Sequence, residues 1–367
     1  MSPYEPCKLP IGDLDFRRLL PLVGKANREL ARYDGLLQGL VNPDIMLSPL
    51  TMEEATFSSR LEGTQATVDD VYEHEAGIEK SPEKTNDVHE IVNYRSALRL
   101  GQRQLSAYPI TLPFIRELHK TLLNSVRGKD KSPGEFRIEQ NWIGPYDSTL
   151  ETATFVPVAP ANLPQHLQDW QTYLSGDDID VLVQTAVMHA QFELLHPFKD
   201  GNGRIGRLLI PLFLYQKKTL SLPMFYLSSY LEANREGYYA SLDAISKESN
   251  WNGWIAFFLN AIAEQAVRNS AKVCNIKSLY DDMKDKIQQY THSQYTVQVL
   301  DQIFKRPMFK TTEFVKETGI PKNSALTILR TLRENDVLKE FIPSSGRRPS
   351  IICFPSLLNT AEGKEIF

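Results

Sequence analysis

The chain has 367 residues, a length that predicts two or three domains and is ample for a hydrophobic core. Its 42% hydrophobic and 23% charged residues exclude collagen-like and disordered classes, and its net charge of −4 argues against coating nucleic acid over the whole surface. Three widely spaced cysteines, no signal-peptide pattern and no long apolar stretch predict a protein of the bacterial cytoplasm rather than a disulfide-stapled or membrane protein.

Helical spacing of apolar residues dominates the chain and predicts a mostly α fold. Apolar residues recur at intervals of three and four, with charged residues on the opposite face. The segments with this pattern are residues 14–40, 86–107, 113–126, 163–174, 181–195 and 251–290.

A shorter helix is expected near residue 50. Ser48 followed by Pro49 predicts its start, and Gly63 predicts its end. Glu62 would then lie in the last turn, where the helix dipole disfavours a carboxylate by up to about 1 kcal/mol. Such a broken local rule often marks a functional site or a compensating cation, so we expect Glu62 to pair with an arginine. The alternative is a surface glutamate without a partner.

Residues 141–160 break the helical pattern. A Gly-Pro-Tyr-Asp turn signal is followed by alternating Thr and Val, which predicts a short β-hairpin or flap. An exposed strand edge of this kind can accept an extended segment of another chain. The alternative is an ordinary surface hairpin.

The most informative stretch is the sequence HPFKDGNGRIGR, residues 196–207. Its three glycines have the spacing of a dinucleotide-binding fingerprint, but the segment before them is helical rather than a strand. No acidic residue follows about 20 positions later to hold a ribose. A Rossmann turn is therefore rejected.

A glycine-rich loop that opens a helix near Arg204 is instead suited to phosphate. Backbone N–H groups at residues 201–203 would face the anion, and Asp200 could hold Mg²⁺ bridging two phosphates. Arg204 and Arg207 would neutralise outer phosphate oxygens, and His196 could take a proton from an attacking hydroxyl. These parts predict metal-assisted transfer of a phosphorus group. In the alternative reading, the histidine caps a helix and the arginines lie on a solvated face.

The C-terminal region has the pattern of a winged helix-turn-helix. Residues 311–318 and 323–335 read as two helices joined by a Gly-Ile-Pro-Lys turn, and extended runs follow to residue 354. Residues 291–353 hold ten Lys or Arg against six Asp or Glu. The second helix carries Arg330 and Arg333 and the predicted wing carries Arg347 and Arg348, which could meet DNA phosphates. Packing or dimerisation is the alternative role.

The pattern His-x-Phe-x-Asp-Gly-Asn-Gly-Arg-x-x-Arg resembles the full signature of the Fic family, and residues 134–144 resemble the segment before that family's target-docking flap. The resemblance implies a protein adenylyltransferase that moves AMP from ATP onto a Ser, Thr or Tyr hydroxyl of a target protein or of itself. It implies His196 as general base and Asp200 as the Mg²⁺ ligand. The residues implied to contact ATP are Glu62, His196, Gly201, Asn202, Gly203, Arg204, Ile205, Gly206, Arg207 and Tyr239.

Residues 58–63 resemble the family's inhibitory motif, Ser/Thr-x-x-x-Glu-Gly/Asn, in its N-terminal position. The resemblance implies that Ser58 supports the inhibitory helix, that Gly63 ends it, and that Glu62 pairs with Arg207. Arg207 would otherwise grip the γ-phosphate of ATP, so resting activity would be low. Some family members use this glutamate to position water for removing AMP, which makes a bifunctional enzyme possible.

Three segments are expected from these signals. Residues 1–105 form an N-terminal helical region with the inhibitory motif, residues 106–275 form the Fic catalytic core, and residues 276–367 hold a linker helix and the winged helix-turn-helix domain. We expect a homodimer, the commonest symmetric oligomer. The alternative function is a DNA-binding regulator in which the Fic domain senses nucleotide.

Overall fold

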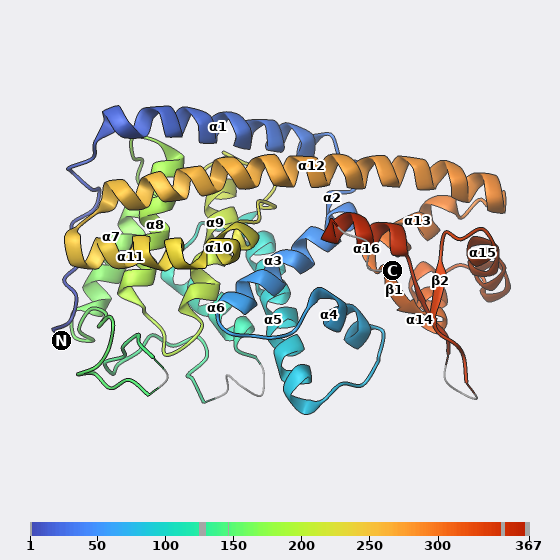
Figure 1. Cartoon of the computed structure of the whole chain (residues 1–367), viewed down its shortest axis with the longest axis horizontal. Coiled ribbons are helices and arrows are strands. Elements are labelled where there is room, and N and C mark those ends of the chain that lie inside the picture. The colour runs from blue at the N-terminus through green and yellow to red at the C-terminus, as the bar shows by residue number, and fades with distance from the viewer. Residues whose placement is uncertain (1, 125–129, 146, 346–348, 364–367) are drawn as a thin grey trace. The chain divides into compact units, whose positions relative to one another are not determined.

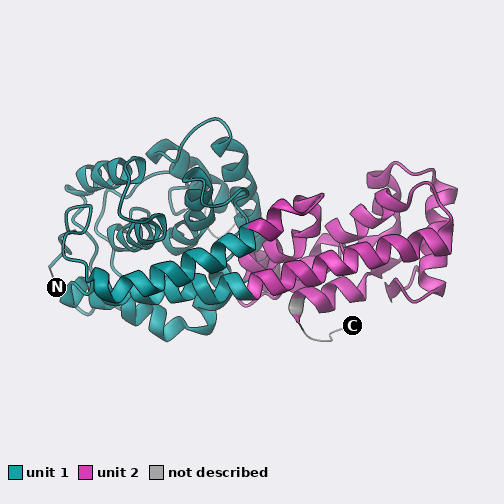
Figure 2. Cartoon of the chain, turned by 90° about the horizontal axis from the view of Figure 1, so that it is seen from above, with its two compact units in different colours: residues 1–34, 57–64, 89–267 teal, residues 35–56, 65–88, 268–367 magenta. Residues whose placement is uncertain are grey.

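A computed structural model of the chain describes residues 2–124, 130–145, 147–345 and 349–363. Helices dominate it (Figure 1), as the periodicity predicted. Two compact units make up the fold, each built from segments that are discontinuous in sequence (Figure 2). The first unit comprises residues 1–34, 57–64 and 89–267, and the second comprises residues 35–56, 65–88 and 268–367. The three successive segments expected from the resemblance stay a prediction.

The long helices predicted from apolar spacing are confirmed within a few residues at each end. Four helices contribute residues to both units: α1 (Phe16–Gln38), α3 (Ser48–Leu61), α5 (Pro82–Leu105) and α12 (Trp251–Thr291). Six lie wholly within the first unit: α6 (Leu112–Leu122), α7 (Leu163–Ser175), α8 (Val181–Leu195), α9 (Asn202–Gln216), α10 (Ser228–Ala233) and α11 (Arg235–Glu248).

Helix α8 is the core of the first unit. Nearly all of its residues are buried, as expected of a helix that is apolar on every side. The side chain of Asp180 caps its start by accepting hydrogen bonds from the N–H groups of Leu182 and Val183. Helices α7, α9 and α11 pack against it. The short connection from α8 to α9, residues 196–201, is therefore presented by two packed helices.

The second unit holds a small sheet with helices around it. Its own helices are α2 (Pro43–Met46), α4 (Val68–Glu75), α13 (Thr296–Lys305), α14 (Thr311–Thr318), α15 (Lys322–Glu334) and α16 (Pro355–Glu362). The strands β1 (Met308–Lys310), β2 (Lys339–Ile342) and β3 (Ile351–Cys353) pair antiparallel in the order β1-β3-β2, with Cys353 opposite Met308 and Lys339. Helix α2 packs on α13, and α4 packs on β1.

The helix-turn-helix of the second unit lies where the sequence placed it. Helices α14 and α15 are joined through Gly319, whose φ of +66° allows the tight turn. The order of helices and strands is the one expected of a winged helix, and that designation remains a prediction. Arg347 and Arg348, expected to contact DNA from the wing, lie outside the described residues.

The predicted hairpin at residues 141–160 is reduced to one antiparallel bridge. Ile143 and Phe155 exchange both backbone hydrogen bonds, at 2.9 and 3.0 Å, but no ladder extends from this pair in the described part of the segment. Prolines at 145, 157 and 160 lack the N–H group that a longer ladder needs. Of the helices described, none is long and apolar enough to cross a membrane.

Candidate active site

The connection between α8 and α9 is a tight loop closed by its own side chains. His196 ends α8 with φ +46°, and Gly201 precedes α9 with φ +76°. The buried Asn202 amide closes the loop, since its Oδ1 accepts from the Phe198 N–H at 2.8 Å and its Nδ2 donates to the Phe198 carbonyl at 2.9 Å. Because α9 begins at Asn202, the predicted helix start near Arg204 was two residues too late.

His119 of α6 supports this loop, and the sequence analysis did not identify it as a site residue. Its Nε2 donates to the Asp200 carbonyl at 2.9 Å, and its Nδ1 accepts from the Gly134 N–H at 2.8 Å. Burial lowers the pKa of His119 to about 4, so the ring is neutral in the tautomer that these two bonds require. The ring also stacks on Phe198 with centroids 3.7 Å apart.

Arg137 holds the other end of the loop. Its Nε donates to the His196 carbonyl and its backbone N–H donates to the Pro197 carbonyl, both at 2.9 Å. The Asn141 amide donates to the Phe198 carbonyl at 3.1 Å. Burial lowers the pKa of Arg137 to about 10, which leaves it charged at neutral pH. Both residues belong to the 134–144 run that the sequence analysis noted, but their function there was not predicted.

His196 is prepared to accept a proton. Its Nδ1 lies 3.2 Å from the carbonyl of Glu193, and because a carbonyl only accepts, Nδ1 carries the hydrogen. The lone pair is therefore on Nε2. Burial lowers the pKa of His196 to about 4, so the ring is neutral at pH 7. This is the protonation state that a general base needs.

The start of α9 offers backbone donors, as expected. The first helical hydrogen bond there runs from the Ile205 N–H to the Gly201 carbonyl, so the N–H groups of Asn202 and Gly203 have no acceptor within the helix. The third expected donor is different, because the Gly201 N–H donates to Asp200 Oδ1 at 2.6 Å. The N–H groups of Asn202 and Gly203 can therefore bind an anion directly, whereas the Gly201 N–H would first have to leave Asp200.

Two glycines of α9 allow carboxylates to approach the helix closely. A Cβ on Gly203 would lie 2.3 Å from Glu62 Oε1, and a Cβ on Gly206 would lie 2.2 Å from Glu193 Oε1. Burial raises the pKa of Glu193 to about 8, so this carboxyl is largely protonated at neutral pH. Its Oε1 has no hydrogen-bond partner among the described residues. Glu193 was not among the predicted site residues.

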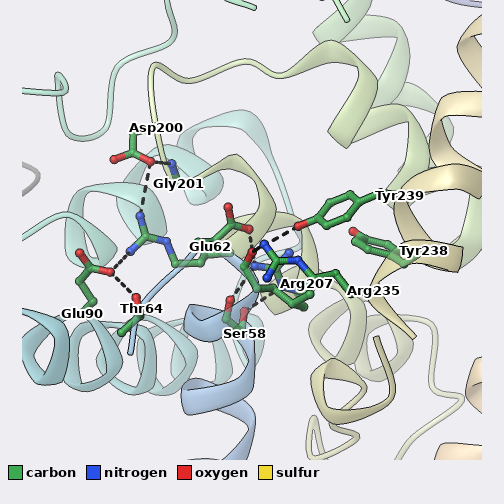
Figure 3. Close-up of polar contacts among 12 residues, drawn as sticks. Ser58, Glu62, Thr64, Glu90, Asp200, Gly201, Arg207, Arg235, Tyr238 and Tyr239 are labelled. Carbon is green, nitrogen blue, oxygen red and sulfur yellow. Dashed lines mark hydrogen bonds and ion pairs between the residues drawn. The ribbon is translucent and has the colours of Figure 1, made fainter. Parts of the chain in front are cut away.

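The arginine that Glu62 was expected to need is Arg207. The buried guanidinium donates from Nη2 to Glu62 Oε1 at 2.6 Å and to the Ser58 carbonyl at 2.8 Å, and from Nε to Ser58 Oγ at 2.9 Å (Figure 3). We call Arg207, Ser58 and Glu62 the Arg207 cluster. Burial alone would raise the pKa of Glu62, but the charge and hydrogen bond of Arg207 outweigh it and lower that pKa.

The expected position of Glu62 in the last turn of its helix was wrong by one residue. Helix α3 ends at Leu61, and Glu62 is the first residue beyond it. Gly63 follows with φ +97°, which supports its predicted role as the stop. The carboxylate still lies at the negative end of the helix dipole, so the argument for a compensating cation is unchanged.

Arg204 has a different set of partners. Its buried guanidinium lies 3.4 Å from Glu90 Oε2 through Nη1 and 3.5 Å from Asp200 Oδ1 through Nη2 (Figure 3). The same Glu90 oxygen accepts from the Thr64 hydroxyl at 2.9 Å. We call Arg204, Glu90, Thr64 and Asp200 the Arg204 cluster. Glu90 comes from α5, more than a hundred residues away in sequence, and nothing local marked it.

A cavity of about 800 Å³ opens beside both His196 and Arg207. The end of α3, the 141–155 segment, α8, α9 and α11 all contribute to its lining. Tyr239 of α11 lines it with its side chain 40% exposed, whereas the neighbouring Tyr238 is buried with its hydroxyl 2.9 Å from His189 Nε2. Tyr239 is therefore the tyrosine of this pair that is open to a ligand.

Comparisons with known proteins agree with this site. Residues 20–103 match the Fic/DOC family N-terminal region, and residues 109–214 match the Fic/DOC family. These two matches together span more than half of the chain. The chain belongs to the Fic/DOC family.

Relatives of this Fic chain carry related names. It is 26% identical over 212 residues to a probable protein adenylyltransferase of Aquifex aeolicus, an alignment that covers 55% of this chain and 60% of that protein. It is 27% identical over 176 residues to the protein adenylyltransferase fic-1 of Caenorhabditis briggsae, covering 46% and 31%. The chain thus spans less than two thirds of either relative.

A crystal structure of a Fic family protein from Desulfovibrio desulfuricans has the same fold. The two match with a TM-score of 0.59 over 96% of this chain and 98% of that one, at 16% sequence identity. The mostly helical Fic fold predicted from the sequence is therefore confirmed. Ile205 of α9 was a predicted ATP contact, but its side chain is fully buried and its N–H donates to the Gly201 carbonyl.

Proposed function

We propose that this chain is a protein adenylyltransferase, a nucleotidyltransferase that moves AMP from ATP onto a Ser, Thr or Tyr hydroxyl of a target protein or of itself. The observation that carries the proposal is that His196 lines the same cavity as Arg207 and, with Nδ1 bonded to the Glu193 carbonyl, keeps Nε2 as its basic nitrogen. The names of the relatives support the same activity.

The reaction forms a bond between the target oxygen and the α-phosphorus and breaks the bond from that phosphorus to the bridging oxygen. Pyrophosphate leaves with the electron pair. His196 Nε2 takes the hydroxyl proton as the oxygen attacks. The N–H groups at the start of α9 stabilise the added negative charge, and this electrostatic contribution is the largest expected part of catalysis.

Asp200 is suited to Mg²⁺ as a single carboxylate ligand. Its side chain is 44% exposed, and its Oδ2 has no hydrogen-bond partner among the described residues. No cluster of three or more metal-ligating side chains occurs in the described part of the chain. That fits Mg²⁺, which is commonly bound through one or two carboxylates plus substrate phosphates. Mg²⁺ held by Asp200 would offset the negative charge of the ATP phosphates.

Two further predicted contacts, those of Tyr239 and Arg207, follow from the lining of the cavity. Tyr239 can stack on the adenine, because its ring is exposed there. Arg207 can grip the γ-phosphate once Glu62 leaves it, since both groups compete for the same Nη2 hydrogens. Residues 142–144 and 154–155 line the same cavity, and the 141–160 segment is proposed to dock the target protein.

Glu62 is proposed to restrain the enzyme. While it occupies Arg207, ATP loses the partner of its γ-phosphate and binds in an unproductive pose. The same carboxylate could orient a water molecule for removing AMP from a modified target, a second activity that rests on the family resemblance. A homodimer is proposed because it is the commonest symmetric oligomer.

The deciding experiment measures label retained on protein after incubation with Mg²⁺ and α-labelled ATP. Glu62→Gly is expected to raise labelling above wild type, and Glu62→Gly with His196→Ala is expected to abolish it. A parallel sample with γ-labelled ATP distinguishes AMP transfer from phosphorylation. Absence of α-label from the Glu62→Gly protein and from every added candidate target would count against the proposal.

DNA binding is a second candidate function, favoured by the exposed face of α15. Lys322, Asn323, Thr327 and Arg330 are exposed there, without an acidic residue between positions 319 and 333. Arg333 is instead paired with Glu340 at 2.8 Å. Retention on heparin that weakens with salt, and that Arg330→Ala reduces, is expected for DNA binding. No retention of the wild type at low salt would exclude it.

A further inference from the structure

The C-terminal end of α3 must find partners for its last four carbonyl groups, which have no donors within the helix. Two of them are satisfied by the chain that follows. The Ser59 carbonyl accepts from the N–H groups of Glu62 at 3.0 Å and Thr64 at 3.3 Å, and the Arg60 carbonyl accepts from the Gly63 N–H at 3.0 Å. This local turn would form in any context that tolerates the positive φ of Gly63.

The other two carbonyls are satisfied by side chains from distant helices. The Ser58 carbonyl accepts from Arg207 Nη2 at 2.8 Å. The Leu61 carbonyl accepts from Arg235 Nη2 at 3.0 Å and from the Tyr239 hydroxyl at 3.3 Å (Figure 3). Both arginines place positive charge at the negative end of the α3 dipole, which is favourable.

The three donors, Arg207, Arg235 and Tyr239, differ in whether a bound nucleotide would compete for their hydrogen bonds. Arg207 is the proposed partner of the γ-phosphate, and Tyr239 is the proposed partner of the base. Arg235 is the first residue of α11 and lies beside Tyr239, with its guanidinium 5.8 Å from the centre of that ring. Arg235 also lines the cavity, but its hydrogen bond is to the backbone carbonyl of Leu61, the residue that directly precedes Glu62. Arg235 is thus the donor that can keep α3 in place while ATP competes for the other two.

We propose that Arg235 is a positioning residue that holds Glu62 against Arg207 by anchoring the Leu61 carbonyl. This inference rests on the proposed restraint by Glu62 and deepens it, because it names the contact that sets its strength. When the anchor is lost, the segment at residues 61–64 moves more freely, Glu62 leaves Arg207 more often, and ATP reaches its productive pose. Arg235 takes no part in the chemical step.

The test uses Arg235→Met, which removes the donors and keeps the length of the side chain, and Arg235→Lys, which keeps a charged donor. Arg60→Met is the matched control. It removes the same charge one residue before Leu61, where the Arg60 guanidinium lies 5.1 Å from the centre of the Phe57 ring and Arg60 is not among the residues that line the cavity. Each change is made in the wild type and in the Glu62→Gly background, and α-label transfer is measured.

Arg235→Met is expected to raise transfer about tenfold over wild type, the effect of losing one charge-assisted hydrogen bond. The transfer rate of Arg235→Lys should lie between those of wild type and Arg235→Met, and the rate of Arg60→Met should equal that of wild type. In the Glu62→Gly background Arg235→Met should change nothing, because the group that it positions is gone. Hydrogen exchange at residues 61–64 should be faster in Arg235→Met, with exchange in α8 unchanged.

Each other outcome has one meaning. If Glu62→Gly is active and Arg235→Met equals wild type, the anchor is wrong and the proposed function stands. If Arg235→Met lowers transfer equally in both backgrounds, Arg235 binds the nucleotide and the inference is overturned. If Glu62→Gly itself gives no transfer, the proposed function fails. In that case hydrogen exchange still tests the anchor, and an unaltered exchange rate at residues 61–64 in Arg235→Met would overturn it. If Arg235→Met does not fold, the transfer rate and the hydrogen exchange of Arg235→Lys decide instead.

Discussion

The Arg204 and Arg207 clusters contain two buried arginines of one short helix, three residues apart, with opposite surroundings. Arg204 is held by Glu90, whose side chain is only 10% exposed, and by Asp200 at the mouth of the site. Arg207 is held by Glu62, whose side chain is 34% exposed and lies just beyond a helix end. The same residue type in the same helix therefore meets a fixed partner in one case and a removable one in the other.

The difference shows how a site can be both stable and adjustable. Replacing a buried carboxylate partner leaves an uncompensated charge in the interior, which is costly. A partly exposed carboxylate can leave into water at far smaller cost. The Arg204 cluster is thus suited to holding the loop in shape, and the Arg207 cluster is suited to exchanging a carboxylate for a phosphate.

The largest effect is expected from removing the exchangeable arginine. In the Glu62→Gly background, Arg207→Met should lower the rate of AMP transfer about 10²–10³-fold, because the charge that grips the γ-phosphate is lost. Lys217→Met removes the same charge at the opposite end of α9 and should leave transfer unchanged. Equal rates for Arg207→Met and its background would show that Arg207 does not contact the nucleotide.

Stability should distinguish the two clusters next. Glu90→Ala should lower the free energy of unfolding by about 2–4 kcal/mol, because the buried Arg204 loses its buried carboxylate and keeps only the partly exposed Asp200. Glu62→Ala should lower it by no more than about 1 kcal/mol, because Arg207 keeps its two hydrogen bonds to Ser58 and lines the cavity, where water can replace the carboxylate. Urea unfolding followed by circular dichroism measures both. Equal losses for the two variants would contradict the distinction between fixed and removable partners.

The smallest expected effect concerns Glu193, which lies beside α9, the helix that carries both Arg204 and Arg207. Burial raises its pKa in the folded chain to about 8 from an ordinary value near 4.5. Between these values the folded state holds a proton that the unfolded state has lost, so this group costs stability as pH rises from 4.5 to 8.

Glu193→Gln should remove that cost. The free energy of unfolding of Glu193→Gln minus that of wild type should be at least about 1 kcal/mol higher at pH 8 than at pH 5. Unfolding curves at the two pH values measure the difference, and Glu236→Gln, an exposed glutamate of α11, is the control. A pH-independent difference between Glu193→Gln and wild type would mean that Glu193 is ionised in the fold.

Local sequence determined a large part of this protein. The long helices follow from apolar spacing, the end of α3 follows from Gly63, and the loop between α8 and α9 follows from glycines and a histidine at fixed spacing. Even the need of Glu62 for a cation was visible, because a carboxylate at a helix C-terminus is unfavourable by itself. All of these signals act within a few residues of one another.

Tertiary structure decided which partners meet. His119, Arg137 and Glu90 hold the loop from other helices or segments, and Arg235 reaches the Leu61 carbonyl from α11. The lowered pKa of His196 and the raised pKa of Glu193 also come from burial. No local pattern encodes these contacts, because hydrogen bonds and desolvation depend on which side chains packing brings together from distant parts of the chain.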